Sequence, residues 1–456
     1  MKGVLMEVSA KLKEIMKEIV IPGADAIRGN ITLPLKIKDA TVSWKSSAPD
    51  VITDRAVGRI AAGVVTRGSF DRDVLLTATV SLDGETAVKD IIVHVLKSPT
   101  KIKDEDYTAY LFGHFIGEEG EDGEQIYFAV SEEGLNFKDM NGGKPVLTSS
   151  VGEKGMRDPF IYRSHEGDRF FLVATDLSIY HRGGWIKNEQ GYFDASTTGS
   201  SYLVLWESDD LVNWRGPELI KAAPENAGMA WAPEIIYCDE TGEYIIFFAS
   251  SIMDPETRMK AKPNAIYYVA TRDFVNFSET KLFIDCQYDG EKNGKEREII
   301  DTTVIKIGDT YYSASKDGDN DEQNGGIRIM KTKDLLNPYS WEKVLDLDEL
   351  HLDLTDAGVD VLDNSQLEGP EFFRYNKADR KDPSAKEIGI IADRYATGQG
   401  YLPLSTADIE DWDNRKGSWK VLSGSEYSFD KLKKRHGTIL RITEKERARL
   451  KRAFMK

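Results

Sequence analysis

Three acidic residues stand at the start of short apolar segments, from which they could act together on one bond. Asp158 lies in RDPFIY, Asp301 in IIDTTVI and Glu368 in LEGPEFF. Hydrolysis of a glycosidic bond needs a base that activates water and an acid that protonates the leaving oxygen. A third carboxylate near the acid would raise the pKa of that acid by like-charge repulsion. The residue types therefore indicate acid–base hydrolysis of a sugar, with Asp158, Asp301 and Glu368 as the catalytic residues.

Two further strand heads continue the series. Trp231 opens WAPEIIY and offers a flat apolar face to a sugar ring, and His436 lies in RHGTIL. Successive heads are 67 to 73 residues apart, a near-even spacing that is typical of an internal repeat. Five such heads predict five residues brought round one axis. Taken singly, the two aspartates and Glu368 could also be turn residues, Trp231 a core residue and His436 a structural hydrogen-bonding group.

The segments after each strand head predict the architecture. Each head is followed by β-rich runs, and then by a turn that ends in an aromatic residue. The fifth head, HGTILRI, has no strands after it, whereas AYLFGHF and QIYFAVS near residues 107–131 have no head. A last blade built from both ends of the chain would leave no open sheet edge. We therefore predict an all-β fold with a five-bladed β-propeller as the catalytic domain over residues 107–456.

Residues 1–20 and 21–97 are predicted to form two smaller units. Leu5, Val8, Leu12, Ile15 and Ile19 recur at helical spacing, which indicates a short amphipathic helix packed on a neighbouring domain. Short strands then follow, with Asp83-Gly84 as a hairpin turn and Trp44 as the centre of a small β-sandwich core.

ITLPLKI, TVSWKSS and VLLTATVSL make residues 21–97 similar to the bacterial immunoglobulin-like modules. The polar segment 97–106 is predicted to be a linker.

Composition narrows the classes of partner. The chain has 456 residues and a formal net charge of -17, which argues against nucleic acid and favours a neutral oligosaccharide. No apolar run is long enough to span a membrane, and no secretory signal is recognisable, so the expected compartment is the cytoplasm. Cys238 and Cys286 fit a reduced state rather than a disulfide framework. The oligomeric state is left open.

The strand heads RDPFI, WAPEI, IDTTVI, LEGPEF and RHGTI, in this order, resemble glycoside hydrolase family 43 over about residues 107–445. This resemblance implies an inverting mechanism with Asp158 as the base, Asp301 as the residue that modulates the pKa of the acid, and Glu368 as the general acid. It further implies that His436 orders a calcium ion or its waters in the channel, as a structural ion that the chemistry does not require. A substrate-holding arginine of related members matches Arg394 in IADRY.

Other candidates lie in the loops and on the closing blade. His114 and His181 could reach the pocket, although a core or surface role is open for each, and Trp185 and Tyr180 are candidate wall aromatics. The acidic run GEEGEDGE at 117–124 is interpreted as a solvated face. Long insertions at 176–200, 284–299, 316–325 and 344–366 would deepen the channel mouth into a pocket, which favours removal of terminal sugars.

The sequence thus predicts a glycoside hydrolase, an exo-acting α-L-arabinofuranosidase that removes arabinose from plant-polysaccharide oligosaccharides. A β-xylosidase and a β-D-galactofuranosidase are the alternatives within this class. A fructan hydrolase shares the RDP motif at Arg157, but the Asn-Asp-Pro strand that such an enzyme needs is missing. From another class, a non-catalytic carbohydrate-binding propeller would not need three acids at the axis.

Overall fold

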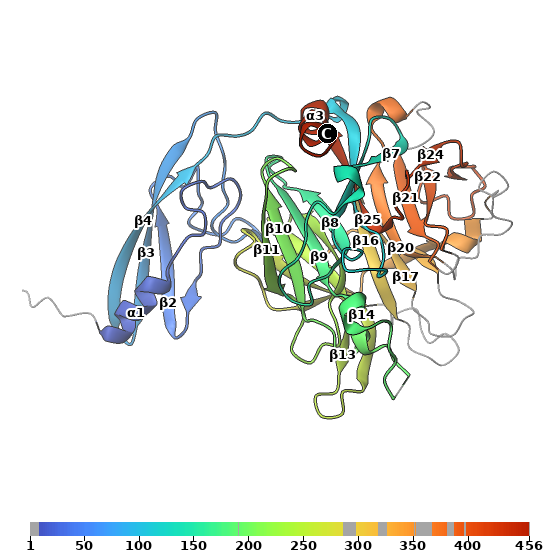
Figure 1. Cartoon of the computed structure of the whole chain (residues 1–456). Coiled ribbons are helices and arrows are strands. Elements are labelled where there is room, and N and C mark those ends of the chain that lie inside the picture. The colour runs from blue at the N-terminus through green and yellow to red at the C-terminus, as the bar shows by residue number, and fades with distance from the viewer. Residues whose placement is uncertain are drawn as a thin grey trace, which may run out of the picture.

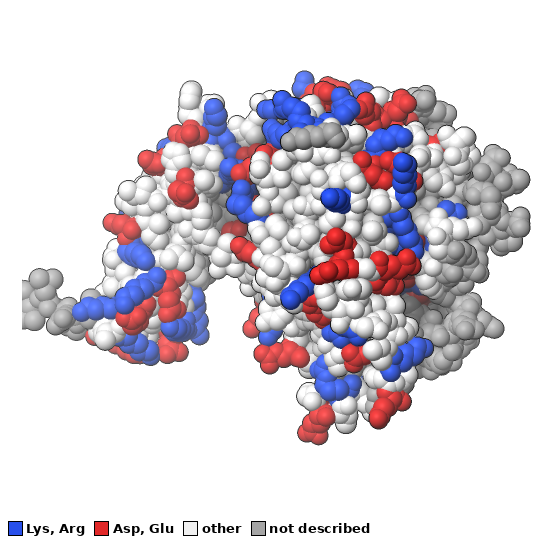
Figure 2. Space-filling model, viewed as in Figure 1, with Lys and Arg blue, Asp and Glu red and all other residues white. Residues whose placement is uncertain are grey.

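The computed structural model describes residues 9–189, 191–285, 298–317, 326–350, 352, 367–380, 387–395 and 398–455. Figure 1 shows a small N-terminal part built on one sheet, and a larger part in which the other sheets stand side by side. In the ranges just given, no helix has the length and apolar character that a membrane span requires. On the face in view in Figure 2, acidic side chains gather near the middle of the larger part, and basic and acidic side chains lie together along its upper edge.

The N-terminal part is a four-stranded antiparallel sheet with a helix against it. Its elements, with the strands paired in the order β1-β2-β3-β4, are α1 (Ala10–Glu18), β1 (Lys36–Ile37), β2 (Ala40–Ser46), β3 (Arg72–Leu82) and β4 (Glu85–Val95). Alternate residues of β2 are buried, as expected when one sheet face covers a core. Asp83 and Gly84 both have positive φ, which closes the β3–β4 hairpin as their residue types predict.

The core of this part combines the helix with the sheet. Leu12, Ile15 and Ile19 are buried in the same apolar cluster as Trp44, whose indole N–H donates to the carbonyl of Pro34 at 2.9 Å. The short N-terminal helix is therefore confirmed; Leu5 and Val8 lie outside the described residues. The apolar side of this helix packs on the sheet, and its Lys and Glu side chains are exposed on the opposite side.

The larger part contains five sheets. The first four are β8 (Met156–Arg163), β9 (Phe170–Asp176), β10 (Tyr202–Ser208) and β11 (Trp214–Lys221); β12 (Trp231–Cys238), β13 (Glu243–Met253), β14 (Lys260–Thr271) and β15 (Lys281–Ile284); β16 (Ile299–Ile307), β17 (Thr310–Asp317), β18 (Ile327–Thr332) and β19 (Glu342–Asp346); and β20 (Glu368–Arg374), β21 (Ile388–Asp393), β22 (Tyr401–Thr406) and β23 (Trp419–Val421).

The fifth sheet joins distant parts of the chain. Its order is β24-β7-β6-β5-β25, from β24 (Tyr427–Ser428), β7 (Leu135–Asp139), β6 (Tyr127–Ser131), β5 (Tyr107–Phe115) and β25 (Arg435–Thr443). The first strands of the sheets contact one another in a ring, from β8 through β12, β16, β20 and β25 back to β8. The predicted five-bladed propeller is confirmed, and its last blade closes as predicted.

Helix α3 (Glu444–Phe454) lies outside the predicted elements. The hydroxyl of Thr443 accepts from the main-chain N–H of Glu446, and the carboxylate of Glu446 accepts from the main-chain N–H of Thr443, so the TEKE segment forms a capping box. Arg163 of β8 donates to Glu446 at 2.6 Å, which ties this helix to the first blade.

The two parts are held together by arginines whose partners are largely main-chain carbonyls. Arg272 of the propeller donates to the carbonyls of Ala61 and Ala62 at 3.2 and 2.7 Å. From the N-terminal part, Arg67 forms an ion pair with Asp168 at 2.7 Å. These buried and half-buried contacts fix the N-terminal sheet beside the first two blades.

Candidate active site

A backbone irregularity at the start of each inner strand turns side chains into the channel. Pairing with the second strand breaks between Arg157 and Phe160, and the same break recurs at the heads of β12, β16 and β20. Within these bulges, Asp158, Ala232, Asp301 and Gly369 have φ of 51°, 47°, 47° and 51°. Non-glycine residues rarely adopt positive φ, and such strain concentrates at functional sites.

The positions of the bulges show that the five predicted strand heads are not structurally equivalent residues. Ala232 and Gly369 occupy the position of Asp158 and Asp301, so Trp231 and Glu368 each lie one residue earlier. Position 369 requires glycine, because a Cβ there would lie 2.5 Å from Cδ2 of His436.

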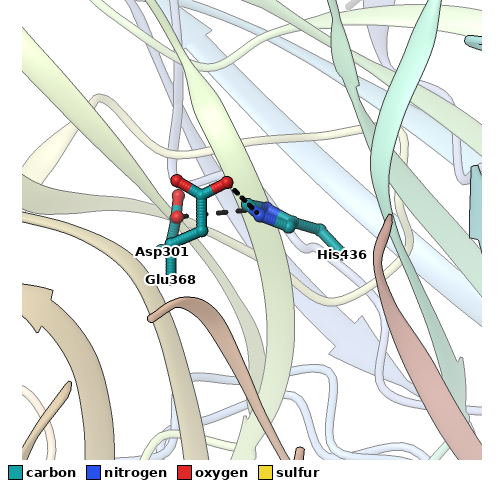
Figure 3. A group of neighbouring side chains, drawn as sticks. All are labelled: Asp301, Glu368 and His436. Atoms are coloured by element: carbon teal, nitrogen blue, oxygen red, sulfur yellow. Dashed lines mark hydrogen bonds and ion pairs between the residues drawn. The ribbon is translucent and has the colours of Figure 1, made fainter. Parts of the chain in front are cut away.

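The structure brings the three predicted acids together around His436. Nδ1 of His436 lies 3.0 Å from Asp158, and Nε2 lies 3.1 Å from Glu368. Asp301 is 3.9 Å from Nδ1 and accepts a hydrogen bond from the main-chain N–H of Gly369 at 3.3 Å. Figure 3 shows both Asp301 and Glu368 pointing toward the imidazole. One ring thus contacts carboxylates from the first, third and fourth blades.

The pKa values of Asp301, Asp158 and Glu368 are shifted in different directions. Burial raises the pKa of Asp301 to about 6, and the charges of Glu368 and Asp158 add to this shift against the opposing effect of His436. Burial would also raise the pKa of Asp158, but the hydrogen bond and charge of His436 outweigh it and lower this pKa.

The pKa of Glu368 is lowered for a similar reason: His436 and Arg435 outweigh the effect of burial. In turn, the surrounding carboxylates raise the pKa of His436 well above its ordinary value, against the effect of burial. The shift expected for Glu368 therefore falls on Asp301 instead.

Arg435 and Asp393 belong to this cluster although the sequence analysis does not single them out. Nη2 of Arg435 donates to Glu368 at 2.8 Å, and its Nε donates to the buried Asp393. Both stand next to residues that the motifs do indicate, namely His436 in RHGTIL and Arg394 in IADRY. The guanidinium of Arg394 donates to carbonyls of its own turn, those of Gln399, Gly400 and Tyr401, and its substrate role stays a prediction.

Two acids of the run at 117–124, Glu118 and Glu124, are built into the site, whereas Glu119, Glu121 and Asp122 are exposed, as the interpretation of the run as a solvated face expects. Glu124 is 1% exposed, and accepts from Arg157 at 2.8 Å and from the main-chain N–H of Ile179 at 2.8 Å. It thereby ties the residue before Asp158 to the first turn of helix α2 (Ile179–Arg182). Burial of a glutamate is explained by this arginine partner, which the sequence does not reveal.

Trp185 and Trp231 form an aromatic corner beside the first acid. Their rings meet nearly edge to face, with centroids 6.2 Å apart. Nε1 of Trp185 donates to Glu118 at 3.0 Å, and the guanidinium of Arg157 lies 5.3 Å from the centre of a Trp185 ring. Both predicted aromatics therefore lie at one wall, which Glu118 and Arg157 hold in place.

The two other predicted histidines have different surroundings. His114 is fully buried in the fifth blade, where it stacks on Tyr127, and burial lowers its pKa well below the ordinary value. His181 is exposed on α2, and its Nδ1 lies 2.8 Å from the hydroxyl of Ser178. The part of each in binding stays a prediction.

Asp301, Glu368 and His436 could hold a metal ion. Each offers one ligand atom, and these atoms lie within 4.8 Å of one another. A cation would need the lone pair of a neutral His436, and so would compete with the proton there. Calcium takes six to eight oxygen ligands, of which the two carboxylates supply a minority, so water would have to complete its shell. Once bound, the ion would add positive charge among the acids.

Two family comparisons cover most of the chain. Residues 105–448 match the glycoside hydrolase family 43-related family that is described as a probable glycosyl hydrolase domain. Residues 13–98 match the atrophied bacterial Ig domain. An α-L-arabinofuranosidase of Bifidobacterium longum subsp. longum is 31% identical over 454 residues, which is 89% of this chain. The chain spans 39% of the length of that relative.

Solved structures align with the chain at low sequence identity and low TM-score. An α-L-arabinofuranosidase from Lactobacillus brevis aligns with 61% of this chain and 74% of its own, at 18% identity and a TM-score of 0.38. An α-L-arabinanase from Cellvibrio cellulosa, solved with arabinohexaose, aligns with 72% and 96% at 12% identity and a TM-score of 0.41.

Proposed function

Because the chain belongs to the probable glycosyl hydrolases related to glycoside hydrolase family 43, we propose that it is an exo-acting α-L-arabinofuranosidase. The observation that carries the proposal is that Asp158 and Glu368 contact opposite nitrogens of one imidazole, with Asp301 beside them. Two carboxylates that contact opposite nitrogens of one ring can flank a single glycosidic bond. The arabinose specificity rests on the sequence likeness to the Bifidobacterium enzyme, together with the motifs.

The proposed roles follow from the charge of each group. Asp158, whose pKa is lowered, is ionised at neutral pH and can accept a proton from water as that water attacks the anomeric carbon. Glu368 is ionised at rest because its pKa is lowered, so it must first take the proton of His436 before it can donate one to the leaving oxygen as the carbon–oxygen bond breaks. His436, 3.1 Å from Glu368, is its proton-bearing neighbour. Asp301 interacts electrostatically with both Asp158 and Glu368. Water attack opposite the leaving group inverts the anomeric carbon.

A side-by-side assay of nitrophenyl glycosides tests the substrate. We expect the α-L-arabinofuranoside to be hydrolysed with the highest kcat/KM, above the β-D-xylopyranoside and the β-D-galactofuranoside. Fastest hydrolysis of either of the other two would replace the proposal by that activity. Sugar binding without hydrolysis of any of the three would favour the non-catalytic propeller.

The aromatic corner is proposed to bind the sugar next to Asp158. Trp185→Ala removes an aromatic face worth about 0.5–1.5 kcal/mol, so we expect KM to rise by roughly 3- to 10-fold while kcat stays within about twofold. Steady-state kinetics on the preferred glycoside would measure both constants.

Trp412→Ala is the matched control, since Trp412 is 53% exposed and stacks near Arg415 on the fourth blade. Equal KM values for wild type and Trp185→Ala would remove Trp185 from the substrate site.

A further inference from the structure

A second layer of inward-facing residues lies beneath the three acids. Side chains alternate along a strand, so the residue two places after each bulge again faces the axis. In three successive blades these residues are Glu234 of β12, Thr303 of β16 and Glu371 of β20. Both glutamates line a cavity of about 30 Å³, enough to hold at least one water molecule, which Asp158, Asp301 and His436 also line.

The two glutamates are buried and contact each other. Glu234 is 7% exposed and Glu371 is 4% exposed, and their carboxyl groups are hydrogen-bonded to one another. The hydroxyl of Thr303 hydrogen-bonds to both. Main-chain groups of Val304 and Ile439 also interact with Glu234 and Glu371 respectively, while Oε2 of Glu234 has no hydrogen-bond partner among the described residues. The pair therefore connects the inner strands of blades two, three, four and five.

Such a contact requires a proton. Ionised carboxylates only accept hydrogen bonds, so one of the two groups must carry hydrogen for the bond to form. Two adjacent charges would also be costly where neither lysine nor arginine is among the groups that hydrogen-bond to the pair.

We propose that Glu234 and Glu371 share one proton and act as a positioning pair, which holds the inner strands of blades two to five in register beneath the active site. This inference goes beyond the proposed function, because it concerns no group that contacts the sugar. The shared proton keeps the floor of the site at one negative charge instead of two. Loss of the contact would shift the strands that begin at Trp231 and Glu368.

The surroundings of the pair support the shared proton. Burial raises the pKa of both glutamates, and the charge of Glu234 raises that of Glu371 further, to well above its ordinary value, whereas the hydrogen bond from Glu371 offsets part of the rise at Glu234. The titratable groups that face the pair are Asp158, Asp301 and His436 around the cavity, Glu368 on the strand of Glu371, and Tyr401 of β22. Burial, with the charges of Asp393 and of Glu371 once they are ionised, raises the pKa of that tyrosine well above its ordinary value, so the tyrosine stays neutral.

The proton should appear as a pH dependence of stability. Folded protein keeps the shared proton well above pH 4.3, near which an unfolded glutamate releases it. The stabilisation is therefore complete below about pH 4.3, and is lost as the pH rises through the folded pKa. Glu371→Gln provides an amide donor in place of the shared proton, so this part of the pH dependence should vanish.

Thermal unfolding from pH 5 to pH 9 is the test. We expect the fall in Tm to be smaller in Glu371→Gln than in wild type by roughly 3–5 °C, with Glu218→Gln, an exposed strand glutamate, falling as wild type does. In wild-type protein with ¹³C-labelled glutamate carboxyl carbons, one glutamate signal should be protonated at pH 7. A matching pH profile in Glu371→Gln, or the absence of a protonated signal, would overturn the proposal.

The positioning role needs a separate readout. Glu371→Leu should lower kcat by roughly 10- to 100-fold with KM little changed, and Glu371→Gln should restore kcat to within about threefold of wild type. Equal loss in both variants would contradict positioning through the hydrogen bond. If Glu371→Leu does not fold, Glu234→Gln and the wild-type ¹³C titration still decide whether the two glutamates share a proton. Neither of these depends on which sugar is hydrolysed, so a wrong substrate would leave their result unaffected.

Discussion

Replacing Asp158 with Asn is expected to lower kcat by roughly 10³-fold while KM stays within about threefold. The amide keeps the size of the carboxylate, and can still meet the hydroxyl of Thr175, which donates to Asp158 at 2.7 Å. It cannot take a proton from water, so the loss should fall on the chemical step. Steady-state kinetics on the preferred glycoside would give both constants.

Asp309→Asn is the control for this variant, because that side chain is 83% exposed and pairs with Lys333 at the surface. Turnover like that of wild type in Asp158→Asn would reject Asp158 as the base. Proton NMR of the first-formed sugar adds an independent check, with the inverted anomer expected. A retained anomer would make Asp158 a nucleophile instead.

Glu368→Gln should produce a loss that depends on the leaving group. On an arabino-oligosaccharide, whose leaving alkoxide needs a proton, kcat/KM should fall by about 10⁴-fold. On a nitrophenyl arabinoside, whose leaving phenolate is stable without a proton, the fall should be closer to 10²-fold. The two substrates would be measured with the same enzyme preparation.

The contrast between the substrates separates proton donation from structural damage. Arg435 and His436 both contact Glu368 at about 3 Å, so Glu368→Gln releases these two groups as well as removing the acid. Release of these groups would lower both rates by the same factor. Equal losses would therefore exclude Glu368 as the general acid, and Glu218→Gln should show no loss on either substrate.

The blade arrangement was predictable because it leaves a repeated trace in the sequence. Each blade needs an inner strand with an inward residue at its head, and HGTILRI lacks the strands that AYLFGHF and QIYFAVS supply. The exact position within each head was not predictable from residue types alone. It depends on the positive φ of the bulge, which Ala232 and Gly369 adopt as Asp158 and Asp301 do.

In the active site, too, some features could be predicted from the sequence and others could not. That Asp158, Asp301 and Glu368 converge follows from the motifs, since inner strands share one axis. The burial of Glu124 could not be predicted from the motifs, because it depends on an ion pair with Arg157, which is 33 residues away in the sequence. A charged residue in an acidic run is normally solvated, and only tertiary contacts reverse that expectation.

The closing blade has a consequence for the order in which the protein can be made. Strands β5, β6 and β7 emerge early in translation, yet β5 lacks its inner neighbour until residues 435–443 of β25 have been synthesised. Thr438 of β25 also bonds the first blade, through the carbonyl of Pro159 and the N–H of Ile161. On the ribosome, the nascent propeller therefore keeps an open seam until β25, the last of its own strands to be synthesised, completes the ring.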